Sequence, residues 1–135
     1  MRLAPARNYW LCRTTPSGAP HAAPVWGVVT GATLYLCSER RTVKARNLAA
    51  DPRVVVHLES GEDVVIVRGT ADDRGAPGQV PEVVAALAAK YDSEGDRQYL
   101  PDADPDFDVV YALRPRSAMM WRLADYEGSQ RRWRS

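Results

Sequence analysis

The sequence predicts a small antiparallel β-barrel formed by a single domain. Seven short segments rich in β-branched and aromatic residues are separated by turn residues such as glycine and proline. Only two short segments have a helical pattern, and they do not alternate with the strands as a parallel sheet requires. The length of 135 residues fits one domain, which we place at residues 1–135.

The first three strands are expected at residues 8–14, 21–30 and 33–38. Aromatic and β-favouring residues fill the first segment, and a Thr-Pro-Ser-Gly turn follows it. The second segment contains Pro24, which cannot donate to a β-ladder, so we expect a sheet edge or a bulge there. Gly27 in the same strand has no side chain, which allows a flat molecule to approach the backbone closely.

A short helix is expected at residues 41–50, with Thr42 as its candidate N-cap. An Asp-Pro pair ends this helix, because a residue before proline disfavours the helical conformation. Strands at residues 53–58 and 63–70 follow, joined by a Glu-Ser-Gly-Glu hairpin loop. The second of them contains a continuous Val-Val-Ile-Val run, which predicts burial on both faces.

The clearest helix covers residues 81–91, with a proline and a glutamate in its first turn. Residues 92–108 hold seven acidic residues and two prolines, which predict an acidic surface loop. A calcium-binding EF-hand loop is not supported, because its glycine and terminal glutamate are missing. The last two strands, 109–114 and 118–123, flank a Pro-Arg-Ser turn, and an arginine-rich tail occupies residues 124–135.

Composition excludes several classes of protein. Lys+Arg 18 against Asp+Glu 17 gives a net charge of +1, too little basic excess for a nucleic-acid-binding protein. No apolar stretch could span a bilayer, and residues 1–7, a short N-terminal extension, lack a signal-peptide core, so we expect a cytoplasmic protein. Cys12 and Cys37 are expected to be reduced packing residues. Two distant histidines, His21 and His57, predict no metal site.

The strongest local constellation runs from a strand end into a helix start. A helix N-terminus offers free N–H groups and a positive partial charge, which favour a bound phosphate. Hydroxyl and cationic side chains cluster in this segment: Ser38, Arg40, Arg41, Thr42, Lys44 and Arg46, followed by Asn47. The pattern indicates a phosphate clamp, and a solvated basic helix face explains the same spacing equally well.

A second constellation lies in the strand that contains Pro24. Val25, Trp26 and Gly27 combine a large aromatic ring with a residue that exposes its backbone. Such a strand can border the edge of a planar heterocycle, with the indole as a wall. The alternative for the Trp26 side chain is an aromatic of the core or of an interface, and we favour this alternative.

Five segments, taken in order and spacing, resemble one known family. They are Tyr-Trp-Leu at 9–11, Thr-Pro-Ser-Gly-Ala-Pro-His-Ala-Ala-Pro-Val-Trp-Gly at 15–27, Lys-Ala-Arg-Asn-Leu at 44–48, Asp-Pro-Arg-Val at 51–54 and Arg-Gly-Thr-Ala at 68–71. Together they look like the pyridoxamine-phosphate-oxidase-like flavin and deazaflavin oxidoreductases. The similarity covers residues 8–91 and, more loosely, 111–133.

The resemblance implies a split β-barrel of about six to seven antiparallel strands with two to three short helices. It also implies a homodimer that binds FMN or the deazaflavin coenzyme F420 in a groove between subunits, next to a small-molecule substrate. Carried onto this chain, the ring would be bordered by Val25, Trp26 and Gly27, the phosphate would lie near Ser38, Arg41, Lys44, Arg46 and Asn47, and Trp133 would pack near the partner's cofactor. The chain departs from the family at Val43, where relatives often carry another basic residue.

Hydride transfer to an activated double bond is the activity that the resemblance implies, and F420 is the favoured cofactor. Its anionic tail needs a basic channel, which the arginine excess could supply. FMN is the alternative cofactor. A non-catalytic carrier of flavin, F420 or haem is a second hypothesis, and an interaction domain without a ligand is a third. No catalytic residue is assigned, although Tyr35, Tyr99 and Tyr126 offer phenols and His21 lies in the ring strand.

Overall fold

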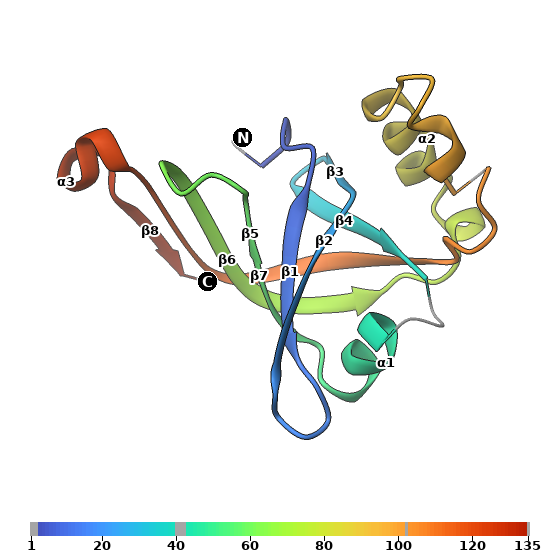
Figure 1. The fold of residues 1–135 in the computed structure, drawn as a ribbon, viewed down its shortest axis with the longest axis horizontal. Helices are drawn as coiled ribbons and strands as arrows, with labels where there is room; N and C mark the ends of the chain where they lie inside the picture. Colours follow the sequence, from blue (N-terminus) through green and yellow to red (C-terminus); the bar gives the residue numbers. More distant parts are fainter. Residues whose placement is uncertain (1–2, 40–42, 102, 135) are drawn as a thin grey trace.

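A computed structural model of the chain describes residues 3–39, 43–101 and 103–134. Eight strands form a single curled sheet in the order β2-β1-β5-β6-β7-β4-β3, with β8 paired to β7 (Figure 1). Every neighbouring pair is antiparallel. The structure confirms the predicted class, a mainly β split barrel with a few short helices.

The order of strands and helices along the chain is close to the predicted one. The strands are β1 Tyr9–Thr14, β2 Pro20–Val25, β3 Gly27–Thr30, β4 Thr33–Ser38, β5 Arg53–His57, β6 Asp63–Asp73, β7 Val109–Arg122 and β8 Arg131–Arg134. The helices are α1 Val43–Ala50, α2 Pro81–Lys90 and α3 Tyr126–Ser129, with 3-10 turns η1 Pro77–Gln79, η2 Arg97–Tyr99 and η3 Leu123–Asp125. The candidate cap Thr42 lies outside the described residues.

The strand predicted at residues 21–30 is in fact two strands that join different neighbours. β2 pairs with β1, whereas β3 pairs with β4, and the chain changes partner at Trp26. β2 forms one end of the sheet, so Pro24 lies in an edge strand, as predicted. The break at Trp26 was missed because both halves have the same β-favouring composition.

The predicted turn between residues 109–114 and 118–123 is wrong. β7 runs without interruption through Pro115, which faces Gly69 of β6. The register of the two strands shifts between Arg68 and Gly69, and such a bulge accommodates a residue that cannot donate a ladder hydrogen bond. A Cβ on Gly69 would lie 2.1 Å from the carbonyl oxygen of Arg114, so glycine allows this close approach.

The continuous apolar run of β6 is not buried on both faces as predicted. Val65 and Val67 point into the half-barrel and are 2% and 4% exposed, whereas Val64 and Ile66 are half-buried on the outer face. The half-barrel has only one interior, so one chain covers only one face of this strand. The outer face therefore remains available to a partner.

The arginine-rich tail is structured. η3 and α3 reverse the chain, the carboxylate of Asp125 accepts a hydrogen bond from the Gly128 N–H, and β8 returns along β7. Ala118 of β7 faces Trp133 of β8. The sequence leaves open a frayed, solvated end or a segment that packs near the partner's cofactor, and the structure shows that backbone pairing with β7 orders the tail.

Two apolar clusters form the core. The larger fills the half-barrel and includes Tyr9, Leu11 and Leu36, and the smaller lies beneath α2 and includes Val83 and Leu87. Within the described ranges, the helices are too short or too polar to span a membrane. The same residues contain no group of His, Cys, Asp and Glu side chains that could hold a metal.

Candidate functional site

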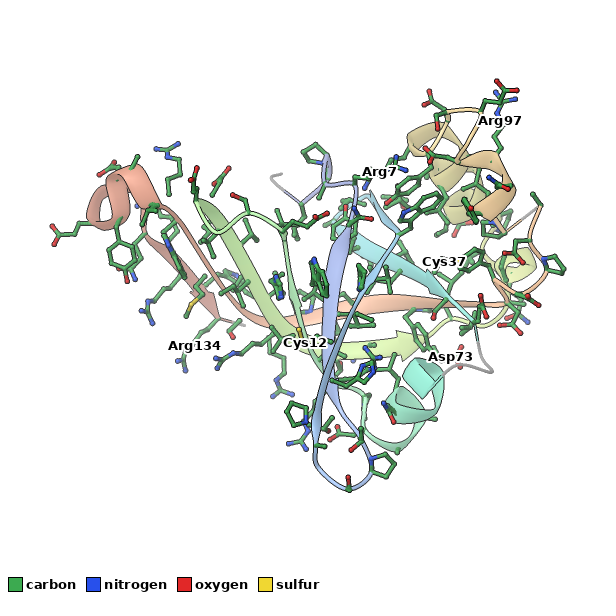
Figure 2. The ribbon with its side chains drawn as sticks, in the orientation of Figure 1. Arg7, Cys12, Cys37, Asp73, Arg97 and Arg134 are labelled. Carbon is green, nitrogen blue, oxygen red and sulfur yellow. The ribbon has the colours of Figure 1, made fainter. Side chains whose placement is uncertain are left out.

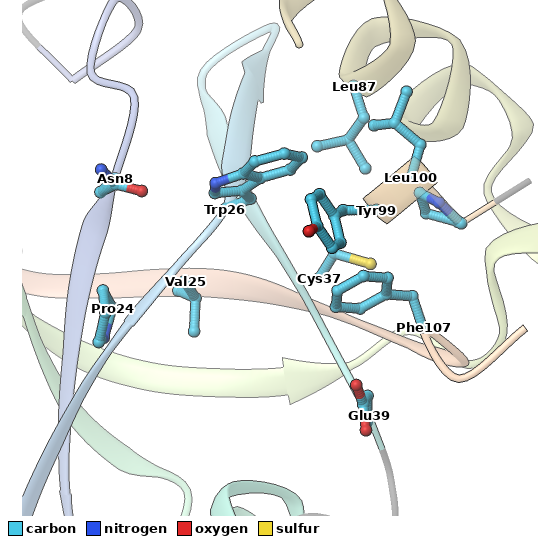
Figure 3. A pocket seen from close by; sticks show the side chains of 11 residues that line it. Asn8, Pro24, Val25, Trp26, Cys37, Glu39, Leu87, Tyr99, Leu100 and Phe107 are labelled. Atoms are coloured by element: carbon cyan, nitrogen blue, oxygen red, sulfur yellow. The ribbon is translucent and has the colours of Figure 1, made fainter. Parts of the chain in front are cut away.

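A cavity of about 360 Å³ opens between β4, α2 and the acidic segment 92–108. Its lining is mostly apolar: Asn8, Pro24, Val25, Trp26, Cys37, Glu39, Leu87, Tyr99, Leu100, Pro101 and Phe107. Figure 3 shows the rings of Trp26, Tyr99 and Phe107 gathered at one end of the cavity. Glu39 supplies the only charged side chain among these lining residues, so the cavity favours an uncharged planar group.

Trp26 is both a packed residue and a wall of the cavity. Its indole stacks on the Tyr91 ring, with a centroid distance of 4.2 Å and an interplanar angle of 3°. Tyr99 meets the indole edge-on at 6.2 Å, and the Arg7 guanidinium lies 5.3 Å from the ring centre. The core interpretation that the sequence favoured for this side chain is therefore incomplete, since Trp26 also lines the cavity.

Gly27 lies directly behind this wall in a tightly packed position. A Cβ there would come within 2.7 Å of the Tyr35 carbonyl oxygen and 2.8 Å of the Leu36 side chain. The glycine therefore lets β3 pack against β4 and is not one of the cavity-lining residues. Val25 and Trp26 line the cavity, and Gly27 lies in the layer that supports it. The role of all three beside a cofactor ring stays a prediction.

The acidic segment 92–108 is not only a surface loop. Asp96 is 7% exposed, and the guanidinium of Arg7 donates to both of its carboxylate oxygens. These hydrogen bonds hold the pKa of Asp96 below its ordinary value. The ion pair ties the segment to the N-terminal residues, and this contact positions Tyr99 and Leu100 over the cavity.

Lys90 lies half-buried at the end of α2, and burial lowers its pKa to about 8. Between this value and the ordinary value of the unfolded lysine, the unfolded chain binds more protons, so stability rises with pH. We expect the stability of the wild type relative to Lys90→Met to increase by about 1 kcal/mol from about pH 7.5 to about pH 10, after allowance for solvent screening. Urea unfolding of both proteins at each pH measures this, and parallel pH curves would contradict it.

The predicted phosphate end lies where β4 leads toward α1. Ser38 and Asn47 are 3% and 2% exposed, and the Ser38 Oγ and Asn47 Nδ2 atoms have no hydrogen-bond partner among the described residues. Cys37 and Glu39, the two neighbours of Ser38 in the chain, line the cavity, whereas Ser38 and Asn47 themselves are not among its lining residues. Arg41 lies outside the described residues, as do the side chains of Lys44 and Arg46. Two of the predicted phosphate residues therefore carry buried polar atoms in need of a partner.

Trp133 lies far from this cavity within one chain. It is 47% exposed on β8, and β8 and α2 lie on opposite sides of the molecule (Figure 1). Figure 2 likewise shows Arg134 on one side of the molecule and Arg97 on the other. Contact between Trp133 and a cofactor in this cavity would require a second copy of the chain.

The candidate proton donors are spread over the molecule. Tyr99 lines the cavity, Tyr35 packs against the cluster beneath α2, and Tyr126 lies at the far end beside Trp121. His21 is exposed on β2 and hydrogen-bonds through Nδ1 to the Arg13 guanidinium. Tyr99 is therefore the phenol that the fold places at the candidate site.

The family model of pyridoxamine 5'-phosphate oxidase matches residues 6–121 of the sequence, which is most of the chain. The chain belongs to the pyridoxamine 5'-phosphate oxidase family. This match confirms the resemblance that rests on the order and spacing of five sequence segments between Tyr9 and Ala71. No curated protein sequence matches this member of the family.

Solved structures show the same fold. A haem-binding protein from Mycobacterium smegmatis superimposes with a TM-score of 0.72 at 22% identity, over 96% of this chain and 53% of that protein. An F420 reductase superimposes with a TM-score of 0.68 at 24% identity, over 87% of this chain and 93% of that protein. General stress protein 26 from Bacillus anthracis gives 0.67 at 19% identity, over 96% and 90%. At these identities the similarity shows a shared fold.

Sequence reasoning missed Lys90 and Tyr91, which contact Gly27 and Trp26 beside the cavity, and it also missed the burial of Arg13, which is not among the cavity-lining residues. Lys90 and Tyr91 were treated only as the end of a helix, and Arg13 only as part of a strand. Arg13 is 4% exposed and donates to the Leu11 carbonyl, and its Nε has no partner among the described residues. Burial lowers its pKa. The available signal was the alternation of β1, which points an arginine inward two residues after Leu11.

Proposed function

We propose that this chain is an oxidoreductase that binds F420 and transfers hydride to or from a small organic substrate, with FMN as the alternative cofactor. The observation that supports this most directly is the cavity walled by Val25 and Trp26. Ser38, which follows the lining residue Cys37 in the chain, adds a buried hydroxyl that lacks a partner among the described residues. Membership of the family and the superposition on an F420 reductase are consistent with it.

The residues at both ends of the proposed site fit such a cofactor. A mostly apolar cavity with three aromatic rings suits a planar ring system. The Ser38 hydroxyl and the Asn47 amide are donors without partners among the described residues, and phosphate oxygens would satisfy them. Ser38, Asn47 and the cations of the helix start would hold the phosphate, while Val25 and Trp26 would border the ring.

The reduced cofactor supplies the hydride when it is bound, and the chain positions the reactants. Leu87, Leu100 and Phe107 give the cavity apolar surface, which would limit the access of water once a ligand fills it. The stacked Trp26 fixes one wall, which orients a planar group against the substrate. The Tyr99 hydroxyl is the phenol that lines this cavity and is our candidate for proton transfer to the neighbouring carbon.

A haem is a poorer fit for the cavity. The described lining residues include no histidine or methionine, and the residue types among them that can bind haem iron are Tyr99 and Cys37. Cys37 does line the cavity, but burial raises the pKa of its thiol to about 12, which disfavours the thiolate that binds iron. We therefore favour a flavin-type ring over a haem.

Titration with F420 and FMN tests the proposed function and the choice of cofactor. We expect saturable quenching of tryptophan fluorescence by both cofactors, with tighter binding of F420. At about 100 times its dissociation constant, a bound cofactor adds about 2.7 kcal/mol to the free energy of unfolding, which a thermal shift detects. Tight FMN binding without an F420 response would reverse the preference. A protein whose melting temperature neither cofactor changes would be an interaction domain instead.

We also propose that two copies of the chain assemble through the outer face of the sheet. Register aligns rows of half-buried side chains across four strands of this face: Trp10, His57, Ile66 and Met119 in one row, and Val64 with Trp121 in another. Trp10 and His57 stack with parallel rings at 6.2 Å. An apolar face of this kind suits a symmetric dimer interface, and the second copy could bring Trp133 to the cofactor.

An Ile66→Arg variant tests this interface. The substitution places a charge at the centre of the outer face, so we expect a dimeric wild type and a monomeric variant in sedimentation velocity. If the second copy completes the site, cofactor affinity falls at least about tenfold as well. Ala85→Arg, on the exposed side of α2, is the matched control and stays dimeric. A wild type that sediments as a monomer with cofactor bound would contradict the interface.

A further inference from the structure

The wall of the cavity depends on a peptide at the point where the chain changes sheet partner. Val25 ends β2 and Gly27 begins β3, so Trp26 lies between two strands. The Trp26 carbonyl accepts a hydrogen bond from the Cys37 N–H at 3.2 Å. The position of the indole therefore depends on how firmly the following Gly27 residue is held.

Both polar groups of Gly27 are bound by side chains from the end of α2. The Gly27 N–H donates to the Tyr91 hydroxyl at 3.0 Å, and the Gly27 carbonyl accepts from Lys90 Nζ at 2.9 Å. The Tyr91 hydroxyl in turn donates to the Arg7 carbonyl at 2.6 Å. Two consecutive residues thus fix a residue more than sixty positions earlier in the sequence.

Tyr91 acts on Trp26 through its ring as well as its hydroxyl. The parallel stack at 4.2 Å holds the indole plane, and the hydroxyl holds the adjacent residue. Tyr91 is 1% exposed, so solvent does not compete for these contacts. The same side chain therefore fixes both the orientation and the position of the indole.

Lys90 has the contacts of a cation bound by aromatic rings. Its Nζ donates to the Tyr9 hydroxyl at 2.8 Å and lies 4.7 Å and 5.2 Å from the ring centres of Tyr9 and Tyr91. The Tyr9 hydroxyl donates onward to the Leu3 carbonyl at 2.6 Å. No ion-pair partner for Lys90 occurs in the described part of the chain, and the Gly27 carbonyl and the two rings offset only part of the burial that lowers its pKa.

We propose that Lys90 and Tyr91 are positioning residues of the cofactor cavity. They clamp the N–H and the carbonyl of Gly27 and so set the position of the Trp26 indole against the ring of the ligand. The inference rests on the proposed function, because it assigns the clamp to the ring end of that site. It predicts that the clamp affects recognition of the ring and leaves recognition of the phosphate unchanged.

The experiment compares FMN and riboflavin, which share a ring and differ in the phosphate. Tyr91→Phe retains the stacked ring and removes the hydroxyl, and Lys90→Met removes the donor to Gly27. We expect both variants to lose at least tenfold affinity for FMN and for riboflavin alike. Lys90→Arg, which keeps a cationic donor, recovers most of the affinity. Tyr126→Phe, at the far end of the molecule, is the matched control and binds as the wild type does.

A second measurement keeps the clamp testable without any cofactor. The Gly27 amide proton is protected from exchange in the wild type, and Tyr91→Phe increases its exchange rate at least tenfold while Tyr126→Phe does not. If the wild type binds neither F420 nor a flavin, the proposed function fails, and loss of this protection still supports the clamp. Unchanged Gly27 exchange in Tyr91→Phe overturns the clamp, as does a loss of affinity confined to FMN.

Discussion

Replacement of Gly69 by alanine is expected to lower the free energy of unfolding by about 3 kcal/mol or more. The new Cβ would lie 2.1 Å from the Arg114 carbonyl oxygen, 2.9 Å from its carbonyl carbon and 3.0 Å from the Pro115 Cα. All three atoms belong to the backbone of β7, so no side-chain rotation relieves the overlap. β6 and β7 would have to separate at the bulge, although they pair along the whole length of β6.

Chemical denaturation of the wild type, Gly69→Ala and Gly61→Ala measures this cost. Gly61 lies in the hairpin before β6, and a Cβ there meets no atom within 4 Å. This matched control shifts the unfolding free energy by less than about 0.5 kcal/mol. A Gly69→Ala protein as stable as the control would mean that Pro115 and Gly69 do not face each other.

The second large effect is expected at the phosphate end of the site. Ser38→Ala removes a buried hydroxyl that has no partner among the described residues, so the ligand-free protein loses little stability or gains some. With FMN bound, the same substitution removes a hydrogen bond to a charged phosphate, which is typically worth about 1.5–3 kcal/mol. We therefore expect FMN affinity to fall by about 10- to 100-fold while unfolding in the absence of ligand is unchanged.

Riboflavin provides the control for this prediction, because it lacks the phosphate and should bind the wild type and Ser38→Ala equally. Ser60→Ala is the matched control variant, since the Ser60 hydroxyl accepts hydrogen bonds from exposed amides of the hairpin. Isothermal titration of both ligands against all three proteins gives the comparison. Equal FMN affinity in Ser38→Ala and the wild type would remove Ser38 from the phosphate site, and equal losses for both ligands would place it at the ring.

Local composition was enough to predict most of the fold. β-branched runs and turn residues located the first hairpin, the β5–β6 hairpin and α2, because each of these depends on neighbouring residues. Pro115 was misread as a turn, since its tolerance within β7 comes from the bulge at Gly69, more than forty positions earlier in the sequence. The sequence also did not predict β8 as a strand, because this strand depends on backbone pairing with β7 and not on its cationic side chains.

The candidate site likewise contains residues that a local sequence pattern can select and residues whose roles depend on distant contacts. Val25 and Trp26 could be placed from a strand motif, and the cavity indeed contains them. Tyr91 and Lys90 could not, because their roles arise only when α2 packs beside β3. Asp96 was assigned to a solvated acidic surface, and its pairing with Arg7 joins segments that no local pattern connects.

The central place of β7 in the sheet has a consequence for the time course of folding. β4, which carries the lining residue Cys37, and its neighbour β3 reach the rest of the sheet only through β7, a strand that begins at Val109. On the ribosome, the first hundred residues therefore emerge before this side of the cavity can join β6. Such long-range closure makes folding slow, and we expect the ligand cavity to be among the last features to form.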